Sequence, residues 1–191
     1  MALIDTHPHR FGYKLWRVPS GLSRLVSPFE GGLLTGLSLD AKCPHGNEAP
    51  SPDCPCGVHY VPDLGAFYQF PRDPALLKDA DTDMHSRIAV TFGAAVGGIA
   101  ADCESGVGCL RATRYRVLAI FVADGLAPER DPLQQQYECP LSVGISPQDL
   151  QLAVKCVPDR GLDWFDELAA TPLAPEDEWT RNYNAAMREL W

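Results

Sequence analysis

The chain has 191 residues, of which 46% are hydrophobic, and its formal net charge is -9. This length and apolar content suit one globular domain with a hydrophobic core and exclude general disorder. The negative charge opposes the phosphate backbone, so nucleic acid is a disfavoured partner.

The N-terminal segment and the cysteines bear on the compartment. Residues 1–9 contain Asp5, His7 and His9 and form a polar tail without the apolar core of a signal peptide. No apolar run reaches the length of about 18 residues that a membrane helix needs. We therefore expect a cytoplasmic protein, or one held inside a particle, that has no membrane segment. The protein has seven cysteines, and a reducing compartment favours metal binding over disulfides where they cluster.

Extended segments dominate residues 10–123. Residues 13–18 alternate apolar and polar side chains, which is typical of a half-buried strand. A second extended stretch, in which Leu33, Leu37 and Leu39 share one face, runs toward Cys43. Asp73-Pro74 predicts the start of a short helix that ends near residue 80.

Two longer strands follow and are expected to form a hairpin around a loop at 102–108. The first covers residues 87–101 and the second covers residues 110–123. The second half of the latter is apolar on both faces, so this strand is expected to run through the core.

Residues 124–191 are richer in proline and acid and are predicted to be helical. Ser146-Pro147-Gln148-Asp149 resembles a helix start with an acidic capping residue, and that helix should end before Pro158. A last helix is indicated by one apolar stripe, which consists of Trp179, Tyr183, Ala186, Met187 and Leu190. The stripe is expected to pack on its own domain, and a partner protein is the alternative.

The expected fold is α+β with three parts. Residues 1–9 are the tail, and residues 10–123 form a β-rich domain that contains a loop with clustered cysteines. Residues 124–191 form an acidic, proline-rich helical region packed on that domain. The β-rich part is a small, strongly bent antiparallel sheet or a partly open barrel, with the cysteine-containing loop at one end.

One constellation carries clear chemistry. Cys43, His45, Cys54 and Cys56 follow the pattern C-x-H, eight residues, then C-x-C. Two close ligand pairs can clamp one ion from two sides of a loop, and Cys3His is a common ligand set of structural zinc. The prolines of the loop reduce the entropy lost on ordering it, and Gly57 lets the chain leave the second pair tightly.

The predicted zinc site leaves two alternatives open. His59 is close enough in sequence to replace His45 as the nitrogen ligand. A redox role for Cys54 and Cys56 is the other alternative, although this dithiol lacks the helix start that lowers a thiol's pKa. With four protein ligands the zinc has no open position, so it would be structural and not catalytic.

The same loop resembles an uncharacterised family of bacterial and phage proteins with a cysteine, a histidine stretch and then Cys-x-Cys-Gly-Ile-Tyr. Here the corresponding residues are Cys43, His45 and residues 54–60. The family's Gly-Tyr-x-x-Trp-Arg-Val strand is similar to residues 12–18, and its Gly-x-Arg-Ala turn is similar to residues 109–112. Departures are His59 near the family's tyrosine and Thr91-Phe92-Gly93 in place of a Trp-Gly pair. The resemblance spans about residues 10–123 and implies the zinc loop, the domain limits and a bacterial or phage origin, with no activity attached.

Two further groups of residues carry weaker functional signals. Arg111, Arg114 and Arg116 could meet a phosphate or an acidic partner, and ion pairs with the chain's own acids are the alternative. A second metal site would need Cys103, Cys109, Cys139 and Cys156 to come together, and unrelated buried thiols are the alternative.

The tail contains an Asp-x-His-x-His sequence at residues 5–9, which resembles the first metal motif of amidohydrolases. That fold needs about 250 residues, so a polar tail is the preferred interpretation.

These observations favour a non-enzymatic, zinc-stabilised accessory protein of a bacterium or its phage that binds a protein partner. The residues proposed for partner binding are Arg111, Arg114, Arg116, Trp179 and Tyr183. One alternative is a small enzyme with its site between the zinc loop and the Arg111–Arg116 strand, using His59, His85 or a nearby acid as the base. Another is a virion or assembly component. The oligomeric state stays open.

Overall fold

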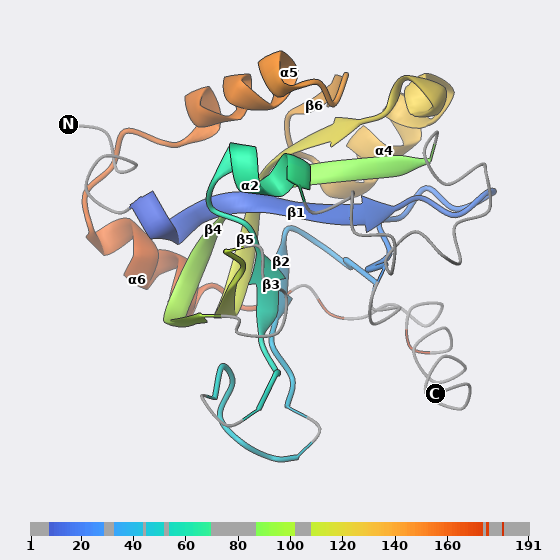
Figure 1. Cartoon of the computed structure of the whole chain (residues 1–191). Coiled ribbons are helices and arrows are strands. Elements are labelled where there is room, and N and C mark those ends of the chain that lie inside the picture. Colours follow the sequence, from blue (N-terminus) through green and yellow to red (C-terminus); the bar gives the residue numbers. More distant parts are fainter. Residues whose placement is uncertain are drawn as a thin grey trace.

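The computed structural model describes residues 8–28, 33–43, 45–51, 54–69, 87–101 and 108–173, together with residues 175 and 181. Within these residues the chain forms one six-stranded sheet with helices on it (Figure 1). The strands are β1 (Phe11–Arg17), β2 (Ser38–Asp40), β3 (Val58–Tyr60), β4 (Ile88–Ala101), β5 (Leu110–Val122) and β6 (Leu141–Val143). The α-helices are α2 (Leu64–Gln69), α4 (Arg130–Tyr137), α5 (Pro147–Gln151) and α6 (Asp163–Ala170). The 3-10 turns are η1 (Pro8–Arg10), η3 (Asp124–Glu129) and η4 (Leu152–Cys156).

β5 is the centre of the sheet. β4 pairs antiparallel with β5 along one edge, as expected of the predicted hairpin, and β1 pairs antiparallel with the far edge of β4. The other edge of β5 is shared by three short strands: β3 lies opposite residues 110–112, β2 opposite 114–116 and β6 opposite 120–122. β6 is parallel to β5 and the other pairs are antiparallel, so the sheet is mixed.

The sheet is strongly curled but not closed into a barrel. Tyr13 of β1 and Val61, just after β3, exchange two backbone hydrogen bonds of 2.9 and 2.8 Å. This single bridge brings the outer edge of β1 toward the far edge of β5. The prediction of an α+β fold with a small, bent, open sheet is confirmed, and the parallel strand β6 is the departure from an all-antiparallel sheet.

A hydrophobic cluster covers each face of the sheet. One cluster joins the sheet to η3 and α4 and includes Trp16, Tyr60, Tyr115, Leu126 and Leu133. The other joins the opposite face to α2, α5, η4 and α6 and includes Tyr13, Phe67, Phe92, Leu150 and Trp164. Because both faces are covered, the apolar half of β5 runs through the core as predicted.

Because both faces of the sheet are covered, β1 is more buried than the sequence predicted. Its alternation predicted a half-buried strand, but even Lys14 is only 8% exposed. The ammonium of Lys14 lies 5.1 Å from the centre of the Trp16 ring and donates to the carbonyl of His59 at 3.4 Å. A lysine can occupy such a buried position because its long stem packs among apolar groups while its charge finds an acceptor and an aromatic face.

The C-terminal region contributes helices as expected, and also a strand. The Ser146 hydroxyl accepts from the N–H of Asp149 while the Asp149 carboxylate accepts from the N–H of Ser146, which confirms the predicted capping box. The helical segment that begins there ends at Cys156, before Pro158. β6 joins the sheet from within residues 124–191, so the sheet extends beyond the predicted boundary at 123.

Some expectations fall outside the described residues. These are the short helix at 73–80, the last helix with Trp179 and Tyr183, and most of the tail. Of the tail, Pro8 and His9 belong to η1, and the His9 carbonyl accepts from the Tyr60 hydroxyl at 2.6 Å. Among the helices of the described part of the chain, none is long and apolar enough to cross a bilayer.

Candidate metal centre

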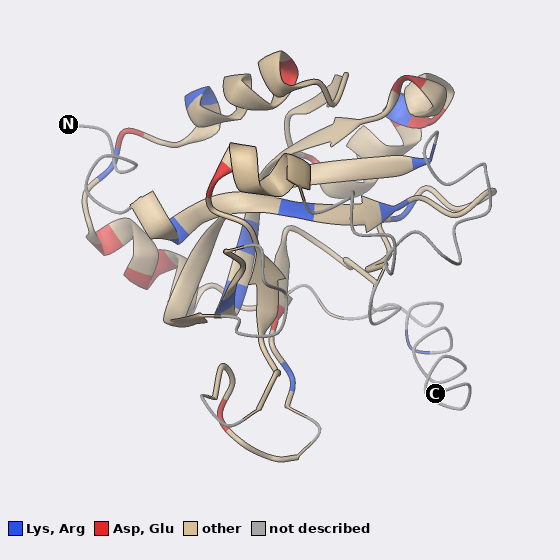
Figure 2. Ribbon diagram, in the orientation of Figure 1, with Lys and Arg blue, Asp and Glu red and all other residues tan. Residues whose placement is uncertain are grey.

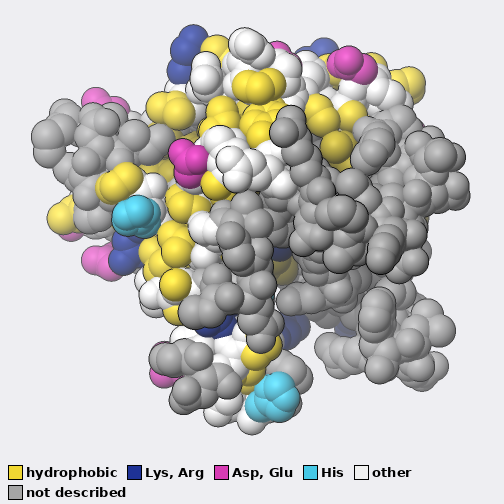
Figure 3. Space-filling model, in the orientation of Figure 1, with side chains coloured by type: hydrophobic (Ala, Val, Ile, Leu, Met, Phe, Trp, Pro, Cys, Tyr) yellow, Lys and Arg dark blue, Asp and Glu magenta, His cyan; other side chains and the backbone are white. Residues whose placement is uncertain are grey.

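The predicted ligands lie in one loop that leaves the sheet between β2 and β3. We call residues 41–57 the cysteine loop. Figure 1 shows this segment projecting from one end of the curled sheet, away from the helices. The space-filling view shows the same projection below the body of the molecule, with a histidine on its surface (Figure 3). The loop therefore presents a small separate surface.

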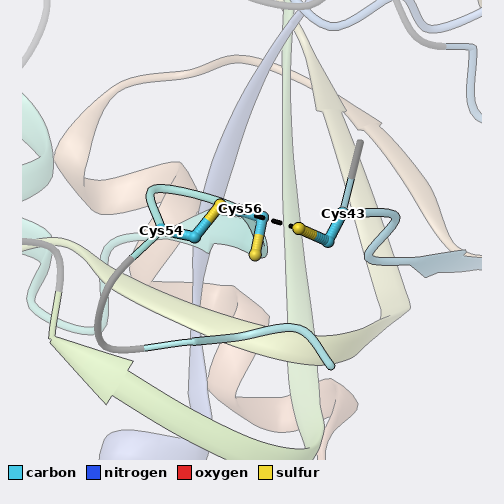
Figure 4. A group of neighbouring side chains, drawn as sticks. All are labelled: Cys43, Cys54 and Cys56. Carbon is cyan, nitrogen blue, oxygen red and sulfur yellow. Dashed lines mark hydrogen bonds between the residues drawn. The ribbon is translucent and has the colours of Figure 1, made fainter. Parts of the chain in front are cut away.

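Three sulfur atoms meet at the base of this loop. The Sγ atoms of Cys43, Cys54 and Cys56 all lie within 4.8 Å of one another (Figure 4). Cys54 and Cys56 are 6% and 8% exposed, while Cys43 is partly exposed. Three thiols from two sides of a loop thus point toward a common point, which is the arrangement that a thiophilic metal ion needs.

His45 stands beside the same point. Its Nδ1 atom lies 3.4 Å from the Cys54 Sγ and 4.0 Å from the Cys43 Sγ, and those two sulfurs are 3.6 Å apart. With zinc bonds of about 2.3 Å to sulfur and about 2.0 Å to nitrogen, a tetrahedral site has S–S edges of about 3.8 Å and S–N edges of about 3.5 Å. These three separations lie near such edges, and the mutual approach within 4.8 Å holds for the three sulfurs and not for His45. The three thiols therefore form the cluster that could hold a metal ion, with His45 beside two of them.

Local backbone geometry explains how the two ligand pairs form. The N–H of Gly46 donates to the Cys43 carbonyl at 3.1 Å, and this turn brings His45 alongside Cys43. On the other side, Gly57 has φ +138°, a region that L side chains rarely adopt. A Cβ at Gly57 would also lie 2.8 Å from the Cβ of Arg111. Glycine is therefore required directly after the Cys-x-Cys pair, as the sequence predicted.

The thiols perturb one another's ionisation. Desolvation raises the pKa of Cys43, but backbone N–H groups of His45 and Asn47 and the thiols of Cys54 and Cys56 outweigh it and lower the pKa to about 6. The Cys56 N–H favours the thiolate of Cys54, yet desolvation, the neighbouring thiols and the charge on Cys43 raise the pKa of Cys54 overall. Of these two thiols, Cys43 therefore ionises more readily at neutral pH, while Cys54 holds its proton more strongly.

Two side chains of β5 hold the loop against the sheet. Arg111, which is 4% exposed, donates from Nη1 to the carbonyls of Cys54, Cys56 (3.0 Å) and Ser51 (3.3 Å). The Thr113 hydroxyl donates to the Ala49 carbonyl at 3.0 Å. The second half of the cysteine loop is thus fixed to one strand through its backbone, at residues 49, 51, 54 and 56.

The alternative nitrogen ligand, His59, points elsewhere. It lies on β3, beyond the Cys-x-Cys pair, and its Nε2–H donates to the Pro55 carbonyl at 3.0 Å. Within the described residues, the nitrogen that approaches the sulfurs is Nδ1 of His45. The geometry therefore favours His45 over His59 as the fourth ligand.

The arginines proposed for partner binding are instead in intramolecular contacts. Figure 2 shows positive positions on β5 near both the cysteine loop and α6. Arg111 is buried against the loop carbonyls. Arg114 forms a two-point ion pair with Asp40 (2.5 and 3.0 Å), and it donates to three carbonyls at the end of α6, those of Leu168, Ala169 and Thr171. The Asp40 carboxylate raises the pKa of Arg114.

Arg116 is the third of these arginines. It donates to the Ser38 hydroxyl at 3.2 Å, and burial lowers its pKa. The three arginines thus have contacts within the chain, and their role in binding a partner stays a prediction. Trp179 and Tyr183 lie outside the described residues.

The other cysteines do not gather in the described part of the chain. Cys109 lies in the cluster on the α2 and α6 face, and Cys139 lies in the cluster on the opposite face. Cys156 packs against the former cluster, and Cys103 is outside the described residues. Burial raises the pKa of Cys139 to about 12, as expected of an inert, buried thiol.

A hollow of about 400 Å³ lies where the enzyme alternative placed its site. Residues 47–51 of the loop line it on one side, with Gly98 and Thr113 on the other. Glu48 is the titratable side chain of this lining. His59 borders a different, smaller hollow beside Lys14, and His85 lies outside the described residues. His59 lies opposite Arg111 in the β3–β5 pair, and Glu48 is an acid beside the hollow, so the enzyme alternative stays a prediction.

No family model matches the sequence, and no curated protein or solved structure is significantly similar to it. The resemblance to an uncharacterised bacterial and phage family therefore stays a prediction.

Proposed function

We propose that Cys43, His45, Cys54 and Cys56 bind one structural zinc ion, and that the projecting cysteine loop is a surface for binding another protein. The observation that supports the metal is the meeting of three sulfur atoms within 4.8 Å of one another, with the Nδ1 atom of His45 3.4 Å from the Cys54 Sγ and 4.0 Å from the Cys43 Sγ. Four protein donors leave no position for substrate or water, so the role of the ion is to hold the loop.

Zinc is favoured by the chemistry of the donors. Three thiolates and one imidazole match the Cys3His sets of structural zinc sites, whereas calcium and magnesium prefer oxygen ligands. Ionised thiols repel one another, and a bound cation offsets that repulsion. The metal would therefore also help to order the loop.

The protein-binding part rests on the shape and exposure of the loop. Residues 45–48 are all exposed, and the loop stands apart from the body of the molecule. Glu48 adds a negative charge next to the hollow that the loop forms with β4 and β5. A partner with a basic or hydrogen-bonding segment would fit this surface, in keeping with the acidic protein as a whole.

Metal analysis of the purified protein tests the first part. We expect about one zinc per chain, and we expect Cys54→Ser to lose the zinc and the order of the loop. Cys139→Ser is the matched control, since that cysteine is buried elsewhere, and it should keep the zinc. Protein that is purified without chelator and carries no metal would refute the proposal.

Affinity capture tests the second part. Glu48→Lys reverses a charge on the loop, and Asp159→Lys makes the same change at an exposed position outside it. We expect a captured protein, identified by mass spectrometry, to be lost with Glu48→Lys and kept with Asp159→Lys while both variants retain zinc. Identical capture by both variants would count against the loop as the binding surface.

A further inference from the structure

The guanidinium of Arg111 is a buried charge with an unusual set of partners. Nη1 donates to the carbonyls of Cys54, Cys56 and Ser51, and Nη2 donates to the Ala101 carbonyl at 3.1 Å. All four acceptors are neutral. Nε is buried and has no hydrogen-bond acceptor among the described residues.

A carboxylate does not balance this charge in the described part of the chain. The ion pairs found there belong to Arg87, Arg114 and Arg160. Removing a cation from water is costly, and neutral carbonyls recover only part of that cost. A nearby negative charge would therefore stabilise the guanidinium of Arg111, which is only 4% exposed.

The metal centre would supply such a charge when it is occupied. Three thiolates, a neutral imidazole and one divalent ion sum to a net charge of about -1. Two of those thiolates belong to Cys54 and Cys56, whose own carbonyls accept from Arg111. The guanidinium is thus bonded to the backbone of two of the ligand residues, and Arg111, Cys54 and Cys56 are all buried.

We propose that Arg111 is the counter-ion of the occupied centre, so that it favours a complex with three thiolates over a neutral one. This inference rests on the zinc site proposed above, and it names Arg111 as a residue that determines the net charge of that site. Arg111 acts through the ligands and not on the metal, so it is a positioning and charge-balancing residue. Without it, three thiolates around one divalent ion leave an uncompensated negative charge.

Zinc affinity, measured by competition with a chromogenic chelator, tests this role. We expect Arg111→Gln to weaken zinc binding by about 10- to 100-fold, the usual effect of losing a group that supports metal ligands. Arg116→Gln is the control on the same strand, since Arg116 donates to Ser38 and not to the loop, and it should bind zinc like the wild type. Unchanged affinity in folded Arg111→Gln would overturn the inference.

A second comparison separates charge from hydrogen bonding. Cys43→His converts the centre to two thiolates and two imidazoles with no net charge, so Arg111→Gln should then cost no more than about threefold in zinc affinity. An equal loss in both backgrounds would mean that Arg111 only positions the loop, and it would overturn the counter-ion role.

Arg111→Lys keeps the test decisive if Arg111→Gln does not fold. Lysine retains the charge but not the planar fork, so we expect only a few-fold loss of zinc affinity. A loss of tenfold or more in folded Arg111→Lys would show that the fork and not the charge carries the effect. A wild type that binds no zinc would refute the proposed function itself, which these variants do not address.

Discussion

Substitution of Gly57 by alanine tests the geometry of the cysteine loop most directly. Gly57 has φ +138°, and an added Cβ would lie 2.8 Å from the Cβ of Arg111 and 3.4 Å from that of Pro50. A non-glycine residue at positive φ costs about 1–2 kcal/mol. Overpacking against a side chain that cannot move costs about 1–3 kcal/mol more. The hydrogen bonds of Arg111 to the loop leave it little room, so we expect Gly57→Ala to lower the free energy of unfolding by about 3 kcal/mol.

Gly21→Ala supplies the matched control. Gly21 also has positive φ (+76°), but a Cβ there would meet nothing within 4 Å. This variant should lose only the backbone term, about 1 kcal/mol. Urea denaturation of both variants in the presence of zinc measures the difference, and an unchanged m-value supports a two-state comparison. Equal losses in the two variants would refute the close packing of Gly57 on Arg111.

Three further predictions concern the body of the fold. Arg114→Gln should lower the free energy of unfolding by about 2–4 kcal/mol in urea denaturation, because it loses a partly buried ion pair and the hydrogen bonds to three carbonyls at the C-terminal end of α6. Arg160→Gln breaks an exposed pair, so it should cost less than about 1 kcal/mol, and a similar loss in both would contradict the assignment. Thr91→Val removes the acceptor, 2.8 Å away, of the buried Trp16 indole N–H and should cost about 1–3 kcal/mol, whereas Thr91→Ser should restore most of it. Burial raises the pKa of Tyr13 from 10.0 to about 12. The unfolded tyrosine therefore ionises first, and stability should fall as pH rises from 10 to 12. Tyr13→Phe should show a shallower fall in alkaline urea titrations, and an identical slope would contradict it.

The clustering of Cys43, Cys54 and Cys56 could be predicted from the sequence because it is local. Cys43, His45, Cys54 and Cys56 lie within one short segment, so their types and spacing alone indicate a common site. The Ser146 and Asp149 capping box was predictable for the same reason. Long-range pairing is different: nothing in the sequence of β6 shows that it lies parallel to β5, because that position depends on η3 and α4 folding between them.

The role of Arg111 was also beyond the sequence. Three arginines on one strand suggested a partner surface, since a sequence does not show which side chains are covered. The structure buries Arg111 under the cysteine loop and places Arg114 at the end of α6. The half-buried pattern expected for β1 was wrong for a related reason. Lys14 is polar, but packing on Trp16 compensates its burial, and periodicity does not record that contact.

The shared edge of β5 has a consequence for the order in which the protein assembles during synthesis. β1, β2 and β3 leave the ribosome before β5, so β2 and β3 have no strand to pair with until residues 110–116 have been made. The four proposed ligands of the cysteine loop, by contrast, are all present once residue 56 has emerged. We expect metal capture to precede sheet formation, because closing a short loop costs less entropy than joining distant strands. In this order of events the cysteine loop is already folded when β5 is synthesised, and Arg111 of β5 then binds the carbonyls of the loop.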